Sequence, residues 1–443
     1  PVLQDLIKQA LANNLDLKQA VARVEQARAQ VVVVGSPLFP QLSYGGGAAR
    51  QSGPIVTSNQ IQSLTYNAYT GNAALNWELD IWGKVRRSTE AAQAELLATE
   101  DIQRGVTITL LADVSSAYFQ LLSLDQQLAI ARGSTELYGK TAKLFKDKYD
   151  GGASSLLPLN RANGQLANAA ADIPAIQRQI VDVENQLSIL LGRLPGPIAR
   201  GAKLDAQRMA PAIPPGLPSE LLERRPDVRQ SEDQLIAENA KIGVAKANFF
   251  PSISLTGLLG IQHSQVSSVL SGTTSIWSFG AGLAGPIFTG GQLTGEYDAQ
   301  VAKWKQSKAN YELTVLKALG EVSNALNGQQ RLVEIRLQRE IAVRELTSSV
   351  DLSLDRYLLG LSDYFEVLTV EEQLYATQLA LVQTQYDQLT NIVQLYRALG
   401  GGWQVAAGAV PPGGGPAPLK VGQQGDAQPV LANGNERAVA RPD

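Results

Sequence analysis

Apolar residues recur along two long segments of the chain in alternating steps of four and three. The first set is Leu110, Val114, Ala117, Leu121, Leu124, Leu128 and Ala131, and the second is Tyr375, Leu379, Val382, Tyr386, Leu389, Val393 and Tyr396. This heptad spacing is typical of helices that pack side by side. Each set is therefore predicted to form a packing seam between neighbouring helices.

Long stretches without proline indicate the helices that carry these seams. Residues 86–149 and 293–357 contain no proline, and at 1.5 Å per residue each predicts a helix about 95 Å long. Helices of that length are far from the average of globular proteins. The other predicted helices cover residues 2–34, 155–192, 219–248 and 363–398.

The chain contains an internal tandem repeat. Tyr149 and Tyr357 are 208 residues apart, and so are Gly152 and Gly360. Each half is predicted to contain a helix, a β-hairpin, a long helix, a tight turn and a further helix. The predicted regions are a first repeat over 1–192, a proline-rich linker over 193–218, a second repeat over 219–400, and a Gly- and Pro-rich tail over 401–443.

Four strands are predicted, at residues 41–53, 65–79, 252–263 and 274–287, so that the hairpins lie within 41–79 and 252–287. Apolar residues such as Leu75 and Trp77 alternate there with polar ones such as Asn76 and Glu78. This alternation fits a strand that crosses a bilayer around a water-filled barrel. It fits equally an antiparallel sheet that packs one face on a core.

Aromatic residues near the strands favour the membrane interpretation, because amphipathic rings gather at bilayer interfaces. The candidates for such interface residues are Phe39, Trp77, Trp82, Phe250, Trp277 and Phe288. Four strands cannot close a barrel in lipid, so a membrane-spanning chain has to form oligomers. Two copies would give eight strands filled with side chains, whereas three would give twelve and leave room for a conduit.

Composition limits the chemistry that the chain can carry out. It has no cysteine and a single histidine, His263, which excludes thiol nucleophiles, His-based triads and zinc sites built from Cys or His. No enzyme activity, catalytic residue, cofactor or metal is predicted. The net charge of −3 gives no reason to expect nucleic-acid binding. No run approaches the roughly 18 apolar residues of a transmembrane helix.

Four motifs resemble the signatures of the TolC-like outer-membrane factors, most closely the OprM-type lipoproteins of drug efflux systems. They are LLERRPDVR at 221–229, FFPSIS at 249–254, WELDIWGK at 77–84 and ALGGGW at 398–403. The resemblance implies a mixed α/β membrane protein. Its trimer would contain a twelve-stranded outer-membrane β-barrel, with four strands from each protomer, and a long periplasmic α-helical barrel.

The resemblance also implies a function and partners. The chain would be the passive exit duct for small molecules in a tripartite multidrug efflux pump, bound to a periplasmic adaptor protein and an inner-membrane transporter of the resistance-nodulation-division class. The sequence begins without a basic or apolar leader, so an export signal is expected to have been removed already. Family members are commonly lipidated on an N-terminal cysteine, which is expected here in the precursor.

The turns between the paired helices are candidates for contact with the adaptor. The candidate tip residues are Gly151, Gly152, Ala153 and Ser154 in the first repeat and Gly360, Leu361 and Ser362 in the second. Glycine permits a left-handed helix end, and Ser or Asp can cap the next helix. Their residue types are explained by helix-hairpin turns alone; the contact with an adaptor is implied by the resemblance.

A candidate gate follows the second turn. Phe365, Thr369 and Glu372 are spaced by four and three residues and share one helix face. In three copies, a ring of Phe365 could exclude water and a ring of Glu372 would favour cations; simple packing and a solvated face explain the same residues. Asp363 adds negative charge nearby. OprM-like proteins have Leu, Asp and Arg at the three positions, so the location of the gate carries over but its charge pattern does not.

Two further readings of the sequence remain open. One is a soluble coiled-coil scaffold protein, and the other, within the same family, is an exit duct for secreted proteins. The motif with Arg224, Arg225, Pro226 and Asp227 is expected to support a helix junction, because proline suits the first turn of a helix and Asp complements its dipole.

Overall fold

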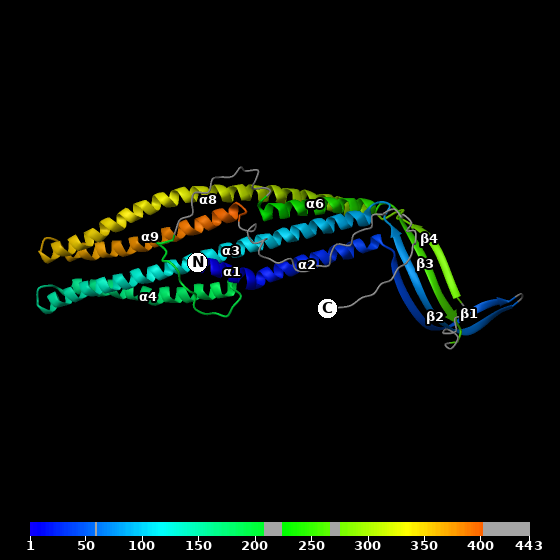
Figure 1. Cartoon of the computed structure of the whole chain (residues 1–443), viewed down its shortest axis with the longest axis horizontal. Helices are drawn as coiled ribbons and strands as arrows, with labels where there is room; N and C mark the ends of the chain where they lie inside the picture. Colours follow the sequence, from blue (N-terminus) through cyan, green and yellow to red (C-terminus); the bar gives the residue numbers. More distant parts are fainter. Residues whose placement is uncertain (58–59, 208–223, 266–274, 402–443) are drawn as a thin grey trace, which may run out of the picture. The chain divides into compact units, whose positions relative to one another are not determined.

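A computed structural model describes residues 1–57, 60–207, 224–265 and 275–401, which fall within one packed unit, Pro1–Trp403. The first half contains α1 (Val2–Asn13), α2 (Leu15–Gly35), the short 3-10 helix η1 (Ser36–Leu38), β1 (Gln41–Thr57), β2 (Gln60–Leu79), α3 (Lys84–Asp150) and α4 (Leu156–Leu190). The second half contains α6 (Pro226–Ala247), β3 (Ser252–His263), β4 (Ser275–Ala284), α8 (Gln292–Leu358) and α9 (Tyr364–Ala398). The predicted internal repeat is visible in this order of elements (Figure 1).

The long helices closely match the proline-free segments. Helices α3 and α8 contain 67 residues each, which corresponds to about 100 Å of helix. The prediction of one helix over 2–34 is wrong, because the helix is interrupted at Asn14. The side chain of Asn14 accepts a hydrogen bond from the amide of Leu17 (2.9 Å) and donates one to the carbonyl of Leu190 (3.0 Å). Asn14 therefore caps α2 and ties it to the end of α4.

The boundaries of four other elements also differ from the sequence prediction. Strands β1 and β2 extend beyond 41–53 and 65–79 towards their hairpin turn. Strand β4 ends at Ala284 and not at residue 287; Pro286 follows it and has no amide to donate to a neighbouring strand. Helix α6 begins at Pro226, because a proline disfavours helical geometry at the residue before it, here Arg225. Residues 219–223 of the predicted helix and residue 274 of the predicted strand lie outside the described residues.

The four strands form one antiparallel sheet in the order β1-β2-β3-β4, in which β2 and β3 join the hairpins of the two repeats. Residues that face each other across antiparallel strands lie on the same side of the sheet. One register row consists of Tyr44, Ala73, Leu259 and Trp277, and a row of the opposite face consists of Gln41, Asn76, Thr256 and Gly280. The sheet therefore has one apolar and one polar face, as the alternation predicted.

The apolar face of the sheet is exposed on the described chain. Tyr44 is 96% exposed, Phe279 81% and Trp277 70%. A soluble sheet would bury such residues on a core, and the described residues of this chain do not do so. An apolar surface of this kind marks a contact with another protein or with lipid.

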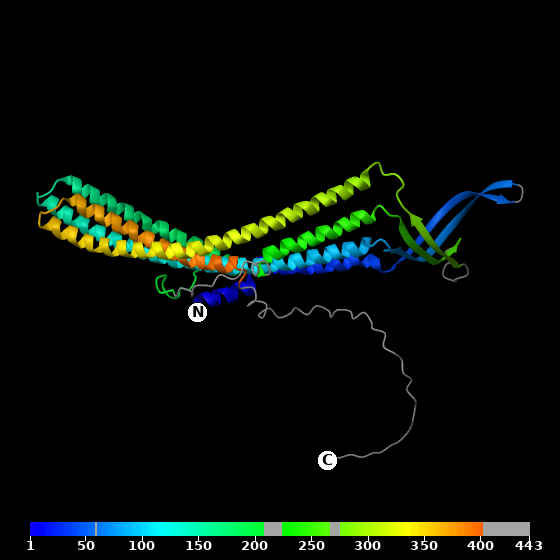
Figure 2. The ribbon, with the colours of Figure 1, turned by 90° about the horizontal axis from the view of Figure 1, so that it is seen from above.

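Helix α3 lies at the centre of the helical part and packs against α1, α2, α4, α6 and α9, while α8 packs against α6 and α9. The two heptad stripes meet in one hydrophobic core, where Val114 and Leu121 on α3 are fully buried and Val382 and Leu389 on α9 are 1% and 5% exposed. Both predicted packing seams are therefore confirmed. As Figures 1 and 2 show, the α3–α4 and α8–α9 hairpins run side by side.

One of the described helices, α3, is long and apolar enough to cross a membrane by composition, although no run of it is uniformly apolar. In its most apolar stretch of 18 residues, 61% of the stretch is buried inside the protein. That burial is typical of a core helix, and it agrees with the central position of α3.

Candidate functional site

Both helix hairpins end in turns of the same construction. In the first turn, the amide of Gly152 donates to the carbonyl of Tyr149 (2.9 Å), and in the second that of Gly360 donates to the carbonyl of Tyr357 (3.1 Å). The two glycines have φ angles of +70° and +73°, a left-handed conformation that ends helices and favours glycine. The turns are therefore equivalent in structure as well as in sequence.

The expected side-chain caps are absent from both turns. Neither Ser155 nor Asp363 accepts a hydrogen bond from the amides of the helix that follows it. In the first turn, the third helical residue is Pro158, which has no amide hydrogen to donate. In the second, the amide of Glu366 donates instead to the backbone carbonyl of Asp363 (3.2 Å). The capping expectation is therefore wrong at both tips.

Most of the candidate tip residues are exposed. Gly151, Gly152, Ala153, Gly360 and Leu361 are exposed, whereas Ser154 and Ser362 are half-buried. The tips also present apolar side chains that the sequence analysis did not single out. Leu359 is 74% exposed and Leu157 is 54% exposed.

The candidate gate residues share an accessible face at the start of α9. Phe365 is 55% exposed, and the guanidinium of Arg161 on α4 lies 5.5 Å from the centre of its ring. Glu372 and Asp363 are exposed, whereas Thr369 is half-buried. The hydroxyl of Thr369 donates to the carbonyl of Phe365 (2.8 Å), so this side chain is occupied within its own helix.

A buried contact between the two hairpins was not anticipated from the sequence. Glu371 is 2% exposed, so its carboxyl does not add to the charge of the accessible gate face. Its carboxylate accepts a hydrogen bond from Thr141 on α3 (2.6 Å), and its carbonyl accepts one from the hydroxyl of Tyr138 (3.2 Å). Gln165 on α4 donates to the carbonyl of Leu368 (3.0 Å). We call these five residues the hairpin seam.

Burial affects ionisation in and beside the hairpin seam. Burial raises the pKa of the Glu371 carboxyl, although the hydrogen bond from Thr141 lowers it in part. Burial also raises the pKa of Tyr375, whose hydroxyl donates to Asp172 on α4 (2.7 Å). Asp172 adds to that shift, because its negative charge disfavours a tyrosinate.

Aromatic packing joins the same two hairpins closer to the tips. Phe145 on α3 is fully buried and meets the rings of Tyr357 and Tyr364 edge-on, at centroid distances of 5.4 and 6.3 Å. The ammonium of Lys148 lies 3.9 Å from the centre of the Tyr357 ring. This cluster couples the end of α8 to α3 independently of Glu371.

The candidate interface aromatics divide into two groups. Trp77 and Trp82 are anchored to the protein, since their indole nitrogens donate to the carbonyls of Leu38 (3.1 Å) and Pro251 (2.7 Å), and Phe250 stacks on Trp82 at 4.7 Å. Phe39, Trp277 and Phe288 are instead 69%, 70% and 90% exposed.

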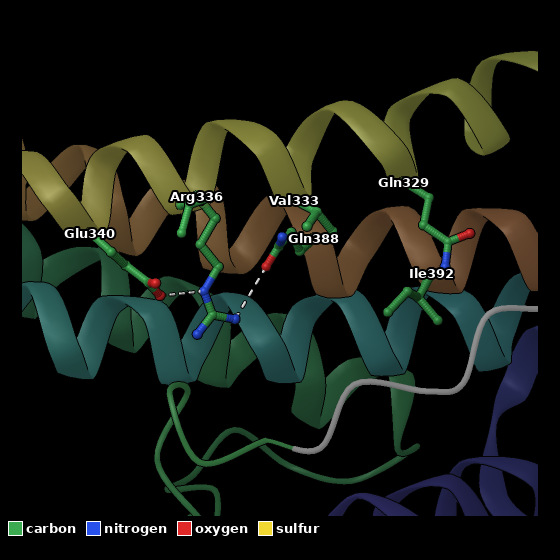
Figure 3. A pocket seen from close by; sticks show the side chains of 7 residues that line it. Gln329, Val333, Arg336, Glu340, Gln388 and Ile392 are labelled. Carbon is green, nitrogen blue, oxygen red and sulfur yellow. Dashed lines mark hydrogen bonds and ion pairs between the residues drawn. The ribbon is translucent and has the colours of Figure 1, made fainter.

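A groove of about 400 Å³ runs between α8 and α9. Figure 3 shows Arg336 crossing its wall, where the guanidinium donates to Glu340 (2.7 Å) and Gln388 (3.3 Å). Val333 and Leu337, which also line the groove, are 58% and 56% exposed. Because its charged groups pair with each other, the groove offers apolar surface and not a polar ligand site.

The arginine motif before α6 forms a helix junction, as expected. Arg225 is 5% exposed and donates to Asp227 (2.7 Å), to Glu321 on α8 (2.8 Å) and to the carbonyl of Ala398 at the end of α9 (2.9 Å). Among the described residues, no group of three or more His, Asp or Glu side chains is placed to hold a metal ion.

Comparison with known proteins gives consistent matches over nearly the whole chain. A protein-family model described as "Outer membrane efflux protein" matches residues 6–193 and 217–401. The toluene efflux pump outer membrane protein TtgF of Pseudomonas putida is 35% identical over 405 residues, which cover 91% of this chain and 84% of that protein. The probable outer membrane lipoprotein SilC of Salmonella typhimurium is 33% identical over 409 residues, with coverages of 91% and 86%.

Solved structures resemble the fold just as completely. The structure of the outer-membrane channel OprN superposes with a TM-score of 0.85 at 29% identity, covering 91% of each chain.

Proposed function

This chain belongs to the outer membrane efflux protein family, and from that membership we propose how its copies assemble and how the assembly conducts. It has the TolC-like fold and is the outer-membrane channel component of an efflux pump, without enzymatic activity. The alternative of a soluble coiled-coil scaffold is thereby excluded. The proposals concern the number of chains in the oligomer, its protein partners, the exported molecules and the position of the gate.

We propose a homotrimer with a twelve-stranded barrel. The observation that carries this proposal is the exposed apolar row through Tyr44, Leu259 and Trp277, which runs across the whole sheet. Within the described chain, β1 and β4 each pair on one side only, and open sheet edges are not tolerated in lipid. Three sheets joined edge to edge would turn the apolar face to lipid and the polar face to a water-filled lumen.

The tips are proposed to bind a periplasmic adaptor protein, and through it an inner-membrane transporter of the resistance-nodulation-division class. Exposed leucines are typical of protein contact surfaces, and Leu157, Leu359 and Leu361 are all more than half exposed. The proposed contact set is Gly151, Gly152, Ala153, Ser154, Gly360, Leu361 and Ser362.

The proposed cargo is small organic molecules and not secreted proteins. This is supported by the likeness to TtgF, the outer membrane component of a toluene efflux pump. The likeness to a probable lipoprotein, SilC, supports a lipid anchor on an N-terminal cysteine of the precursor. Mass spectrometry of the mature protein purified from its own membranes tests the anchor, because acylation would add the mass of the fatty acids.

The gate is proposed to lie at the periplasmic end of α9. Phe365 and Glu372 have accessible side chains on one helix face, with Asp363 exposed beside them. Around a threefold axis they would form an apolar ring and a negatively charged ring. Thr369 lies between them and contributes less, since its hydroxyl is bonded within the helix.

Single-channel recording in planar lipid bilayers tests the gate. Phe365→Ala is expected to raise the resting conductance, and Glu372→Gln is expected to reduce the preference for cations over anions. Glu345→Gln, which changes an exposed carboxylate of α8, serves as the control and should alter neither property. If the two gate variants conduct like the control, the gate is not formed by these residues.

The tip contact is tested by tolerance to toluene in cells that lack the chromosomal copy of the gene. Leu361→Asp places a charge on an exposed apolar tip and is expected to abolish the tolerance that the wild type restores. Leu194→Asp is the control, because Leu194 is 88% exposed in the linker region far from the tips. Full tolerance with Leu361→Asp would refute the proposed contact.

A further inference from the structure

The carboxylate of Glu371 is buried and only half satisfied. One oxygen accepts the hydrogen bond from Thr141 (2.6 Å). The other, Oε2, is exposed by less than 1 Å² and has no hydrogen-bond partner among the described residues. Burial of an ionised carboxylate oxygen without a partner is costly, whereas a protonated carboxyl is far less penalised.

Among the described residues, no positive charge is placed to compensate for Glu371. The ionisable groups that the surrounding helices bring to this level are Tyr138 on α3, Asp172 on α4, Asp351 on α8, and Glu372 and Tyr375 on α9. Asp351 lies eight residues before Leu359, at the end of α8, and Glu371 lies eight residues after Asp363, at the start of α9. The two residues are therefore at about the same distance from the turn. All of these groups are acidic or neutral.

The lysines of α3 at this level do not change that conclusion. Lys140 and Lys143 are exposed, and Lys140 pairs with Glu136 on its own helix (2.8 Å). Within the described part of the chain, Glu371 therefore contacts the other hairpin through hydrogen bonds and not through an ion pair.

We propose that Glu371 is a proton-sensitive lock of the hairpin seam, which holds α9 against α3 when protonated and loosens when it is ionised. The lock acts on a contact that lies one residue before the exposed Glu372. The lock itself does not depend on the proposed function, and only its effect on conduction rests on the proposed position of the gate.

The direction of the effect follows from the burial. In the closed seam the pKa of Glu371 is raised above its ordinary value of 4.5, whereas separation of α9 from α3 would hydrate the carboxyl and restore that value. The closed seam therefore binds the proton more tightly than the open one. Its stabilisation is complete below about pH 4.5 and is lost as the pH rises through the raised pKa. Each unit of pKa difference changes the ratio of closed to open seams about tenfold.

Distances between spin labels test this lock, and the absence of cysteine from the chain makes labelling specific. Labels are attached at Lys140→Cys on α3 and Gln373→Cys on α9, both exposed positions, and the labelled chain is mixed with excess unlabelled chain so that only distances within one chain are measured. Double electron–electron resonance at pH 4.5 and 7.5 should give a shorter and narrower distance distribution at pH 4.5. Glu371→Gln, which mimics the protonated acid, should give that short distance at both pH values.

Two further variants make the test decisive. Glu372→Gln changes the neighbouring exposed carboxyl and should leave the pH response of the distance intact. Thr141→Val removes the hydrogen bond that favours the ionised form, so it should move the response to higher pH. The proposal is overturned if the wild-type distance is the same at both pH values, or if Glu371→Gln retains the response.

Conductance of the same samples separates this proposal from the proposed gate. Conductance that falls together with the distance on acidification would place the seam in control of the channel. If the distance responds through Glu371 but conductance does not follow, the position of the gate is wrong and the lock stands.

Discussion

Replacement of Arg225 by methionine is expected to weaken the junction of three helices. The guanidinium sits at the start of α6 and donates to Glu321 on α8, to the carbonyl of Ala398 at the end of α9 and to the nearby Asp227. Methionine is similar in length to the aliphatic part of arginine but provides no donor. The substitution therefore removes every one of these contacts while largely preserving the packing volume.

The loss of folding stability caused by Arg225→Met depends on the exposure of the three acceptors. A hydrogen bond to a charged group contributes about 1.5–3 kcal/mol, but the side chains of Asp227 and Glu321 are 48% and 49% exposed, so water recovers much of their loss. The carbonyl of Ala398, whose residue is 3% exposed, would be left unpaired at a cost of about 1–3 kcal/mol. A net loss of about 3 kcal/mol is expected.

Thermal unfolding in detergent, followed by circular dichroism at 222 nm, measures this loss. With an unfolding entropy of about 2.1 cal/mol/K per residue, a loss of 3 kcal/mol in a chain of this length lowers the melting temperature by about 3 °C. Arg331→Met removes an exposed pair with Glu334, whose side chains are 61% and 54% exposed, and should lower it by less than about 1 °C. Equal shifts for the two variants would refute the argument that the buried guanidinium holds the junction.

Three other substitutions test single features of the fold. Phe145→Ala removes a fully buried ring at the tips and should cost about 3–5 kcal/mol, measured as faster hydrogen exchange of the tip peptides. Gly192→Ala should lower the melting temperature more than Gly360→Ala. Both glycines have positive φ angles. However, a Cβ at Gly192 would lie 2.5 Å from a backbone oxygen of α1, whereas a Cβ at Gly360 would meet open space. Burial and a neighbouring aspartate raise the pKa of Asp233 to about 6, so its neutral form stabilises the fold fully below about pH 4 and this contribution is lost as the pH rises through 6. Asp233→Asn should therefore raise stability at pH 7.5 by about 1 kcal/mol, after allowance for its partial exposure, and should flatten the profile of melting temperature between pH 4 and 7.

Local periodicity predicted the elements of the fold but could not predict which elements meet. Leu121 and Leu389 were each assigned to a seam from their own heptads, and both are buried. Their common core was not predictable, because periodicity defines the face of a helix and not its partner. The strand alternation similarly defined an apolar and a polar face. The register that aligns Leu259 with Trp277 comes from pairing across the sheet.

The hairpin seam was missed for a related reason. Continued towards the tip in alternating steps, the second heptad stripe predicts burial of Glu372, whereas the structure buries Glu371. A straight helix drifts by about 20° per heptad relative to an exact repeat, so the buried face moves by one residue. Two adjacent glutamates thus have opposite environments, and only the packing of α3 against α9 decides between them.

The trimer is tested by the mass of the detergent-solubilised particle, corrected for bound detergent by combined light scattering, absorbance and refractive index. Closure of the sheet, a central conduit and the proposed gate all require three copies of the chain. The expected result is a protein mass of three times 47.3 kDa. A monomer or a dimer would contradict it, since four strands cannot close a barrel and eight would leave no room for a conduit.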